Sequence, residues 1–307
     1  MAALAEPAPT PLRLATWHAG EGDRVRITPL YRSPVVSFGT FWCAPDDVRW
    51  SLENFVGEVP HIAFPATPVW IAAQGGEPEL AGPNHAVFLN AGEVFRRRRF
   101  NGHGDRNHFM VVSEDTMEEW VHGPRFPNPL GKLLPRPYLS ARVIASAIAG
   151  GADGLTIEES LLRLGHETVV GAFRADERMP RGRRRPVPLV EDAKAVLSAR
   201  FTEHMTLDEL GRQVNVSPFH LARSFRRHTG YTLHEYRTHL RLRAALERLA
   251  AGDEELAVIA RAVGFSSHSH MTSTFRRAFG VPPSSVRNAP ASLVRYPTSG
   301  QTPARGG

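Results

Sequence analysis

Arginine and phenylalanine side chains share one face of the helix predicted to follow Ser217. Leu221 and Phe225 stand four residues apart and therefore lie together on the inward face. The outward positions are Phe219, Ala222, Arg223, Arg226 and Arg227. Arg223 can donate two hydrogen bonds to O6 and N7 of guanine, and Phe219 can pack on a thymine methyl group. The chemistry that this face predicts is the reading of base edges in DNA.

A second predicted helix repeats this layout with milder chemistry. Met271 and Phe275 take the inward positions. The outward positions are His268, Ser269, Thr272, Ser273 and Arg276. Most of these groups are short and uncharged or weakly basic. We therefore expect the first helix to give most of the direct readout, and the second to contribute phosphate contacts and shape reading. For Arg276, Arg277 and Arg287, a phosphate contact and an ion pair within the domain both remain open.

Both helices belong to a unit that occurs twice between Leu207 and Arg287. Four positions recur 49 residues later: Leu207, Leu210, Val214 and Ser217 return as Leu256, Ile259, Val263 and Ser266. After a one-residue insertion, six more recur 50 residues later: Leu221, Phe225, Arg226, Arg227, Gly230 and Arg237 return as Met271, Phe275, Arg276, Arg277, Gly280 and Arg287. Self-similarity of this kind indicates a duplicated structural unit.

Each copy is predicted to fold as helix, tight turn and helix. In the first copy, Thr206 and Glu209 form a capping box, in which each side chain bonds the other residue's backbone amide. Ser217 caps the second helix, and Pro218 takes the first helical position, where no amide donor is needed. Gly230 supplies the left-handed stop. This is the helix-turn-helix layout, whose second helix can enter the major groove.

The turns and the connection between the copies follow the same logic. The turn falls at Asn215-Val216 in the first copy and at Gly264-Phe265-Ser266 in the second. Residues 232–251 form one predicted helix, opened by a capping box of Thr232 and Glu235. Its roughly 18 residues would span ~27 Å. That length could set the two reading helices about one turn of DNA apart.

The segment from about Val190 to Arg287 resembles the DNA-binding domain of AraC/XylS-type transcription regulators. The resemblance rests on NVSPFHLARSFRRHTG, on Arg241-Leu242 in the connecting helix, and on ARAVGFSSHSHMTSTFRRAFGVPPSSVR. It covers about a third of the chain and implies two helix-turn-helix units, with Arg241 bracing the connecting helix. Three packing positions depart from the family pattern: Gly211, Met271 and Val286 stand where alanine, phenylalanine and tyrosine are usual.

The region before this domain is predicted to be a β-barrel or sandwich. Short apolar runs are separated by Pro- and Gly-rich turns, which is typical of β-hairpins. The runs are 25–30, 35–43, 61–64, 69–73, 86–89, 94–100 and 108–112. The family resemblance implies a cupin-like barrel here. The expected fold class is therefore α+β, with a cupin-like N-terminal domain that carries a helical pair and an all-α C-terminal domain.

Three helices are expected after the strands. They cover 114–121, 137–149 and 156–173, the last opened by a capping box of Thr156 and Glu159. The Gly- and Asp-containing turn at 150–154 indicates that the last two form an antiparallel pair. Whether these helices pair two protomers or close the open face of the barrel is left open.

The domain boundaries follow from composition. Residues 1–20 and 289–307 are expected to be disordered, 21–173 to form a sensing or dimerisation domain, 174–189 a basic linker and 190–288 the DNA-binding domain. The net charge is +6, and the region 190–290 holds 14 Lys and Arg against 10 Asp and Glu. The six arginines of the linker could contact DNA or simply keep the linker hydrated. A basic excess of this kind steers a protein toward phosphate.

Other chemistry in the N-terminal half is weaker. The lone cysteine, Cys43, excludes an internal disulfide and a cysteine-based zinc cluster, and is expected to be a buried small side chain. Histidines 61, 85, 103 and 108 could hold a cupin metal, but they lack close ligand spacing, so no metal and no cofactor is predicted. Trp42, Trp50, Trp70 and Phe88 could line an effector pocket or pack in the core.

These observations predict a sequence-specific transcription regulator, and not an enzyme. Its expected partners are double-stranded promoter or operator DNA, a second copy of the chain, RNA polymerase, and a small-molecule effector whose existence is open. No membrane segment or leader is expected, which indicates a cytoplasmic protein. The alternative is an enzyme, either a cupin-type metal enzyme or a repair alkyl-transferase, that carries a DNA-targeting domain. An alkyl-transferase would need a reactive acceptor cysteine.

Overall fold

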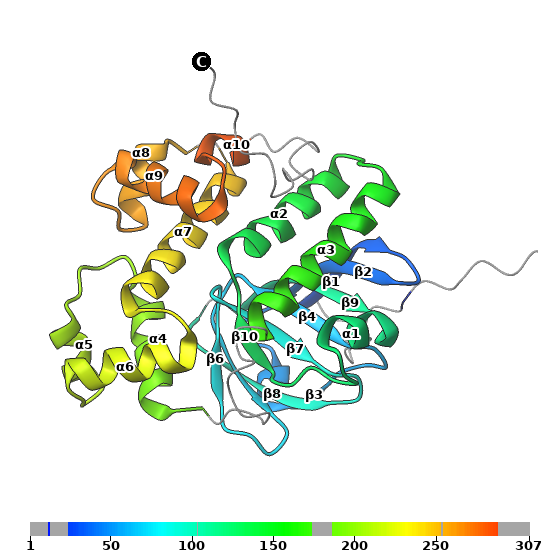
Figure 1. Cartoon of the computed structure of the whole chain (residues 1–307), viewed down its shortest axis with the longest axis horizontal. Coiled ribbons are helices and arrows are strands. Elements are labelled where there is room, and N and C mark those ends of the chain that lie inside the picture. The colour runs from blue at the N-terminus through cyan, green and yellow to red at the C-terminus, as the bar shows by residue number, and fades with distance from the viewer. Residues whose placement is uncertain (1–11, 13–23, 103, 174–185, 253, 288–307) are drawn as a thin grey trace, which may run out of the picture.

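The computed structural model describes residues 12, 24–102, 104–173, 186–252 and 254–287. They form a β-rich N-terminal part and a helical C-terminal part (Figure 1), which confirms the predicted α+β organisation in two parts. The two predicted disordered ends and most of the predicted basic linker lie outside the described residues. The first helix of the C-terminal part begins at Pro188, two residues before the predicted domain boundary.

Ten strands form two antiparallel sheets. The six-stranded sheet has the order β1-β2-β9-β4-β7-β10, formed by Val25–Arg32, Val36–Cys43, Asp105–Val112, His61–Pro65, His85–Leu89 and Leu130–Lys132. The four-stranded sheet has the order β3-β8-β5-β6, formed by Glu53–Phe55, Val94–Arg99, Val69–Ala73 and Glu79–Ala81. A short 3-10 helix, Val48–Ser51, precedes β3. Within the described residues the sheets stay separate, so the arrangement is a sandwich and not a closed barrel.

The sheets and helices stack in three layers. Val87 and Leu89 of the six-stranded sheet pack against Val69, Ile71 and Phe95 of the four-stranded sheet. The other face of the six-stranded sheet is covered by helices α2 (Pro135–Ala149) and α3 (Gly154–Phe173), with α1 (Glu114–Val121) beside them (Figure 1). The helical pair therefore covers the outer face of a sheet. Whether it also joins two protomers stays a prediction.

Both helices of the pair begin two residues earlier than predicted, and α2 begins at Pro135 and not at residue 137. Helix α3 begins at Gly154 and not at Thr156. The Asp153 carboxylate accepts a hydrogen bond from the Thr156 amide at 3.0 Å, so Asp153 satisfies the amide donor of this turn in place of the predicted Thr156 and Glu159 box.

The C-terminal part is entirely helical. Its helices are α4 (Pro188–Arg200), α5 (Leu207–Gln213), α6 (Pro218–Thr229), α7 (Leu233–Ala251), α8 (Leu256–Ala262), α9 (His268–Phe279) and α10 (Pro283–Arg287). The capping boxes predicted at Thr206 and Thr232 are both present. Helix α7 connects the α5–α6 unit to the α8–α9 unit, and the α5–α6 unit with α4 lies beside β6 of the four-stranded sheet (Figure 1). Arg241 braces α7 as expected, since its Nε donates to the Phe201 carbonyl at 2.6 Å.

A short stretch of the N-terminal part, residues 130–136, contacts both helical units, and we call it the docking segment. The Lys132 ammonium donates to the carbonyl of Gly230 at the end of α6, at 3.0 Å. The Arg136 guanidinium lies beside Gly280 at the end of α9. A cation is favourable at a helix C-terminus because the last carbonyls carry partial negative charge. The docking segment thus holds the C-terminal ends of both helices that are predicted to read DNA.

Between these two contacts, Arg243 of α7 is buried against the docking segment. It is 1 % exposed, donates to the Leu133 carbonyl and the Asn84 side-chain oxygen, and lies over the Tyr138 ring. Asn84 in turn donates to the Tyr236 carbonyl at 2.9 Å. The two parts of the chain are therefore joined by a buried polar contact as well as by apolar packing.

Candidate nucleic-acid interface

Helix α6 is built as its sequence predicts. The Ser217 hydroxyl accepts from the His220 amide at 3.3 Å, and Gly230 ends the helix in the left-handed conformation with φ of 69°. Leu221 and Phe225 are fully buried against α4 and α7. Their burial turns the opposite face of α6 outward.

Helix α9 has the same construction with a one-residue offset. Its cap is Ser267, whose hydroxyl accepts from the His270 amide at 3.1 Å, so the cap lies one residue beyond the counterpart of Ser217. The insertion seen in the sequence is therefore placed between turn and helix. Met271 and Phe275 are fully buried, and Gly280 ends the helix with φ of 83°.

The turns before the two helices correspond in backbone conformation. Asn215 has φ of 56° and Gly264, 49 positions later, has φ of 87°. The left-handed region strongly favours glycine and tolerates asparagine. At Gly264 a side chain is excluded a second time, because a Cβ atom would lie 2.4 Å from the Thr202 carbonyl oxygen. The turn of the second unit is thus packed against the residues that follow α4.

The repeated arginines Arg237 and Arg287 have equivalent structural partners. The Arg237 guanidinium donates to the Met205 carbonyl at 3.1 Å, and the Arg287 guanidinium donates to the Glu254 carbonyl. Met205 and Glu254 each precede the cap residue of their own unit, Thr206 or Glu255. For Arg287 the structure favours a bracing role within the domain over a phosphate contact.

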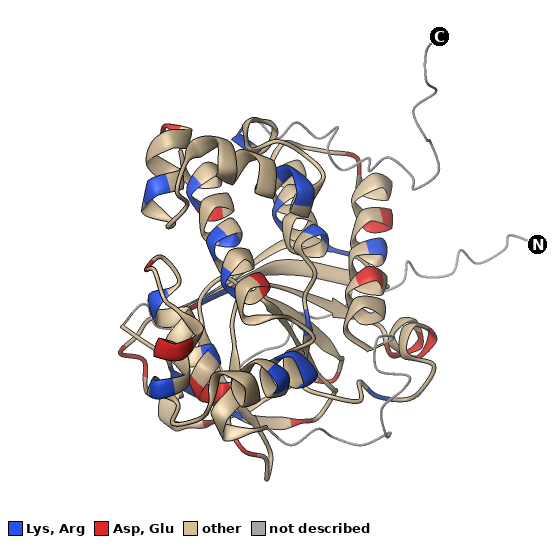
Figure 2. Ribbon diagram, turned by 60° about the vertical axis from the view of Figure 1, so that its left-hand side comes forward, with Lys and Arg blue, Asp and Glu red and all other residues tan. Residues whose placement is uncertain are grey.

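Most of the predicted reading residues are exposed. On α6 these are Phe219, Arg223, Arg226 and Arg227, with Ala222 half-buried; on α9 they are His268, Ser269, Ser273 and Arg276, with Thr272 half-buried. The Thr272 hydroxyl is itself buried without a partner in the described structure. The three α6 arginines form no ion pair within the described part of the chain. Figure 2, in which this side comes forward, shows basic residues on both units.

An apolar groove of about 500 Å³ runs beside α6, between α5 and the start of α7. Phe219, Ala222, Arg223 and Arg226 belong to its lining, together with Leu207 and Leu233. Phe219 is 75 % exposed, which is unusual for a phenylalanine side chain. Guanidinium groups and apolar surface therefore occur side by side here, as reading of guanine edges and thymine methyl groups requires.

The histidines that the sequence offers as possible metal ligands lie in separate parts of the N-terminal region. His61 lies in the narrow space between the sheets, His85 packs at a tilt against Tyr236, and His108 stacks on Phe38 on the outer sheet face. His103 lies outside the described residues. Among the residues that the structure describes, no group of three His, Cys, Asp or Glu side chains is placed to hold a metal.

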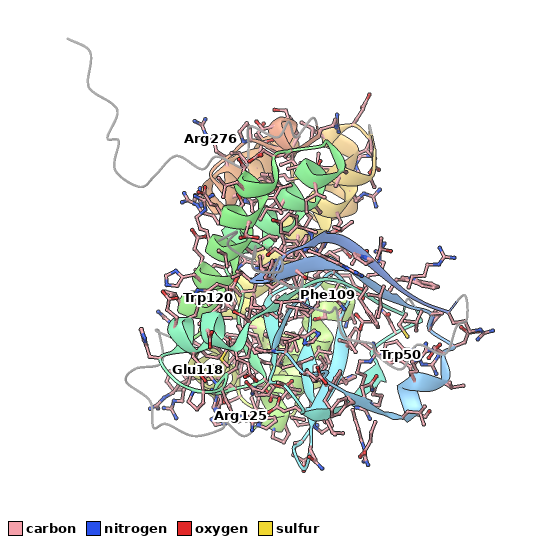
Figure 3. All side chains as sticks on the ribbon, turned by 90° about the vertical axis from the view of Figure 1, so that its right-hand side faces the viewer. Trp50, Phe109, Glu118, Trp120, Arg125 and Arg276 are labelled. Carbon is pink, nitrogen blue, oxygen red and sulfur yellow. The ribbon has the colours of Figure 1, made fainter. Side chains whose placement is uncertain are left out.

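The aromatic residues and the cysteine are equally dispersed. Trp42 lies beside Arg26, Trp70 beside Arg98, and Phe88 packs with Phe126 and Phe173, so these side chains line no common pocket. Trp50 lies on the far side of the β-rich part from Arg276 (Figure 3). Cys43 is fully buried, as expected, and burial raises the pKa of its thiol. A buried thiol of raised pKa does not suit an alkyl-acceptor role.

Sequence reasoning missed Arg243 and the docking segment. The available signal was an arginine on the same helix face as Tyr236 and Leu240, three to seven residues apart. A charged group on an apolar face indicates a buried polar partner. Its partner could not be identified because Asn84 lies 159 positions away in the chain.

Comparison with known proteins agrees with the geometry of the C-terminal part. Residues 210–289 match the family described as helix-turn-helix domain. The chain is 35 % identical over 92 residues to the transcriptional activator RhaS of Pectobacterium atrosepticum, covering 30 % of this chain and 33 % of RhaS. It is 33 % identical over 101 residues to the transcriptional regulator ArgR of Pseudomonas aeruginosa, covering 33 % and 31 %. The chain thus spans about a third of the length of these relatives.

Among solved structures, the chain is similar to an AraC-type DNA-binding domain protein from Chromobacterium violaceum. The identity is 31 %, with 33 % of this chain and 90 % of that chain covered at a TM-score of 0.32. ToxT of Vibrio cholerae matches 84 % of this chain and 98 % of its own, at 10 % identity and a TM-score of 0.35. The predicted resemblance to AraC/XylS-type regulators is confirmed for the C-terminal region. RhaS and ArgR are both named as regulators of transcription. No helix among the described residues is long and apolar enough to cross a membrane.

Proposed function

We propose that this protein is a sequence-specific DNA-binding transcription regulator of AraC/XylS type. The observation that carries the proposal is the duplication of a complete helix-turn-helix unit, with the same left-handed turn position and the same bracing arginine in both copies. Helices α6 and α9 are the elements that enter the major groove. The 19 residues of α7 separate the two units by a length close to one turn of DNA.

The two reading helices divide the work. Helix α6 presents Arg223 and Phe219 near its N-terminal end, where groups of recognition helices contact bases. Helix α9 presents His268, Ser269 and Ser273, which suit phosphate and shape reading, with Arg276 toward its C-terminal end. Thr272 contributes less, because its hydroxyl is buried.

The remaining partners extend the proposal to the whole protein. A relative is named a transcriptional activator, which supports contact with RNA polymerase at a promoter. The N-terminal sandwich, for which the family resemblance implies a cupin-like fold, takes the role of a sensing or dimerising domain for a small-molecule effector in a cytoplasmic homodimer. The enzyme alternative gains no support from the names of the relatives.

A selection from randomised duplexes with the full-length protein tests the proposal. We expect two short conserved blocks about one helical turn apart, bound far more tightly than scrambled DNA at two salt concentrations. Arg98→Ala is the control variant. It removes one positive charge from the four-stranded sheet and should select the same motif as the parent protein. If binding is weak, falls steeply with salt concentration and yields no motif, the protein binds DNA only through its general positive charge.

A further inference from the structure

A second cavity lies outside both the sandwich interior and the DNA-reading face. It has a volume of about 530 Å³ and lies between the outer face of the six-stranded sheet and helices α2 and α7. Its floor is a ladder of cross-strand neighbours. Arg26 pairs with Trp42 and Trp42 with Arg106, while Thr28 pairs with Thr40 and Thr40 with His108. Residues paired in this way lie on the same face of a sheet.

The lining carries an excess of positive charge. Arg26, Arg106 and Arg142 supply three guanidinium groups, and Glu247 supplies the one carboxylate. Burial and the nearby Arg142 lower the pKa of His108 to about 3, so His108 is neutral at physiological pH. The excess is therefore close to two charges.

Arg142 lines this cavity and has one guanidinium nitrogen without a hydrogen-bond partner in the described structure. Its Nε donates to Glu247 at 2.7 Å, and its Nη2 donates to the Tyr138 hydroxyl at 2.9 Å. The Arg142 side chain is only 8 % exposed, and its Nη1 is buried and has no partner in the described structure. A buried unsatisfied donor of a charged group is costly and marks a place where an acceptor is missing.

The two arginines of the cavity floor, Arg26 and Arg106, can also donate hydrogen bonds to a bound anion. Arg26 lies over the Trp42 ring at 5.6 Å, and both Arg26 and Arg106 are exposed. Neither forms an ion pair with any other residue that the structure describes. Guanidinium groups on an aromatic and hydroxyl-bearing floor suit an oxygen-rich anion, because each can donate two parallel hydrogen bonds to carboxylate or phosphate.

We propose that this cavity binds a small organic dianion, held by Arg26, Arg106 and the free Nη1 of Arg142. Dicarboxylates and phosphate monoesters share the required charge and oxygen geometry. The bound anion competes with Glu247 for Arg142, and Glu247 is the α7 residue that accepts hydrogen bonds from both Arg142 and Tyr138. Occupancy of the cavity thus weakens one contact between α2 and α7.

Isothermal titration of the full-length protein, without DNA, tests the site with three probes: succinate, glucose 6-phosphate and neutral glucose. We expect saturable binding of at least one of the two anions and none of glucose. The comparison between succinate and glucose 6-phosphate identifies the anionic group. Because no DNA is present, the result is independent of the proposed regulatory function.

Variants make the test specific. Arg26→Gln with Arg106→Gln should weaken binding by about tenfold or more, the effect of losing charge-assisted hydrogen bonds. Arg98→Gln is the matched control, since Arg98 is also exposed and lies over a tryptophan, Trp70, at 5.4 Å. It should leave affinity within about twofold.

Glu247→Gln should change affinity in the opposite direction. It removes the carboxylate that occupies Arg142, so binding should tighten by several-fold. Absence of saturable binding to both anions, or equal weakening by Arg98→Gln, would overturn the site. Unchanged affinity in Glu247→Gln would overturn the competition. Circular dichroism melting of each variant verifies that it is folded.

Discussion

Arg223 is the side chain that we propose to discriminate between bases in the first unit. It is exposed near the start of α6, beside the apolar groove that also contains Phe219. Arg223→Ala should cost ~1–3 kcal/mol at the selected site and relax preference at one base pair. Anisotropy titrations against duplexes altered at single positions measure this. Uniform weakening across all duplexes would instead assign Arg223 to phosphate.

Arg287 should behave oppositely to Arg276, although the sequence places both near the second reading helix. Arg287 donates to the Glu254 carbonyl, while Arg276 is exposed. Arg287→Ala should therefore lower the free energy of unfolding by about 1–2 kcal/mol. It should leave the slope of log affinity against log salt unchanged, whereas Arg276→Ala should reduce that slope by about one. A reduced slope in Arg287→Ala would restore its phosphate role.

His61 should make the protein sensitive to acid. The ring is 2 % exposed, and burial lowers its pKa from 6.5 to about 4. Between these values the unfolded chain binds a proton that the folded chain does not, so stability falls as pH decreases from 6.5 toward 4. The loss attributable to His61 is about 3 kcal/mol when complete. Denaturant titrations at pH 7 and pH 4.5 should show a smaller loss for His61→Gln than for the parent chain.

At the scale of elements, the second helix-turn-helix depends on its turn. Gly264 combines a φ of 87° with a space that a Cβ atom would enter within 2.4 Å of a backbone oxygen. Gly264→Ala should destabilise the protein by about 1–3 kcal/mol, measured by chemical denaturation. The matched change Asn215→Gly, at the equivalent turn, should be nearly neutral because glycine accepts its φ of 56°. Equal effects of the two changes would contradict this account.

The C-terminal elements were predictable because their signals are local. Capping boxes at Thr206 and Thr232, the stops at Gly230 and Gly280, and the inward stripes are each contained within a few residues. Helix ends and faces follow from such short-range patterns. The predicted reading residues therefore fall on the exposed face, apart from the half-buried Ala222 and Thr272.

The N-terminal elements were less predictable because their determinants are not local. Strands β3, β6 and β10 have only three residues each, which is too short for an alternating pattern to be recognised. They exist because of partners far along the chain, such as β10 against β7. The anion cavity was missed for the same reason, since its arginines come from β1, β9 and α2.

At the scale of the whole molecule, the docking segment relates the two reading helices to each other. Arg243 is the centre of this contact, bonded to Asn84 and to the Leu133 carbonyl. Arg243→Ala should lower the free energy of unfolding by about 3 kcal/mol, because it removes two charge-assisted hydrogen bonds and leaves the buried Asn84 side-chain oxygen without its donor. Arg243→Met keeps most of the side-chain volume but has no hydrogen-bond donor, so it separates the contribution of the hydrogen bonds from that of packing. A parent-like stability of Arg243→Met would show that packing alone holds the parts together.

The two reading units differ in what surrounds them. Leu221 and Phe225 belong to an apolar core whose described members lie within residues 187–240, whereas Met271, Phe275 and Phe279 share one apolar core with α2 and the outer sheet face. The C-terminal part is therefore not an interchangeable cassette. In a chimera with a foreign sensor, the first unit would keep its apolar core but lose the Lys132 contact, whereas the second would lose part of its apolar core. A working chimera would need to include α2 and the docking segment. The smallest transferable DNA-binding fragment of this protein therefore begins inside its N-terminal half.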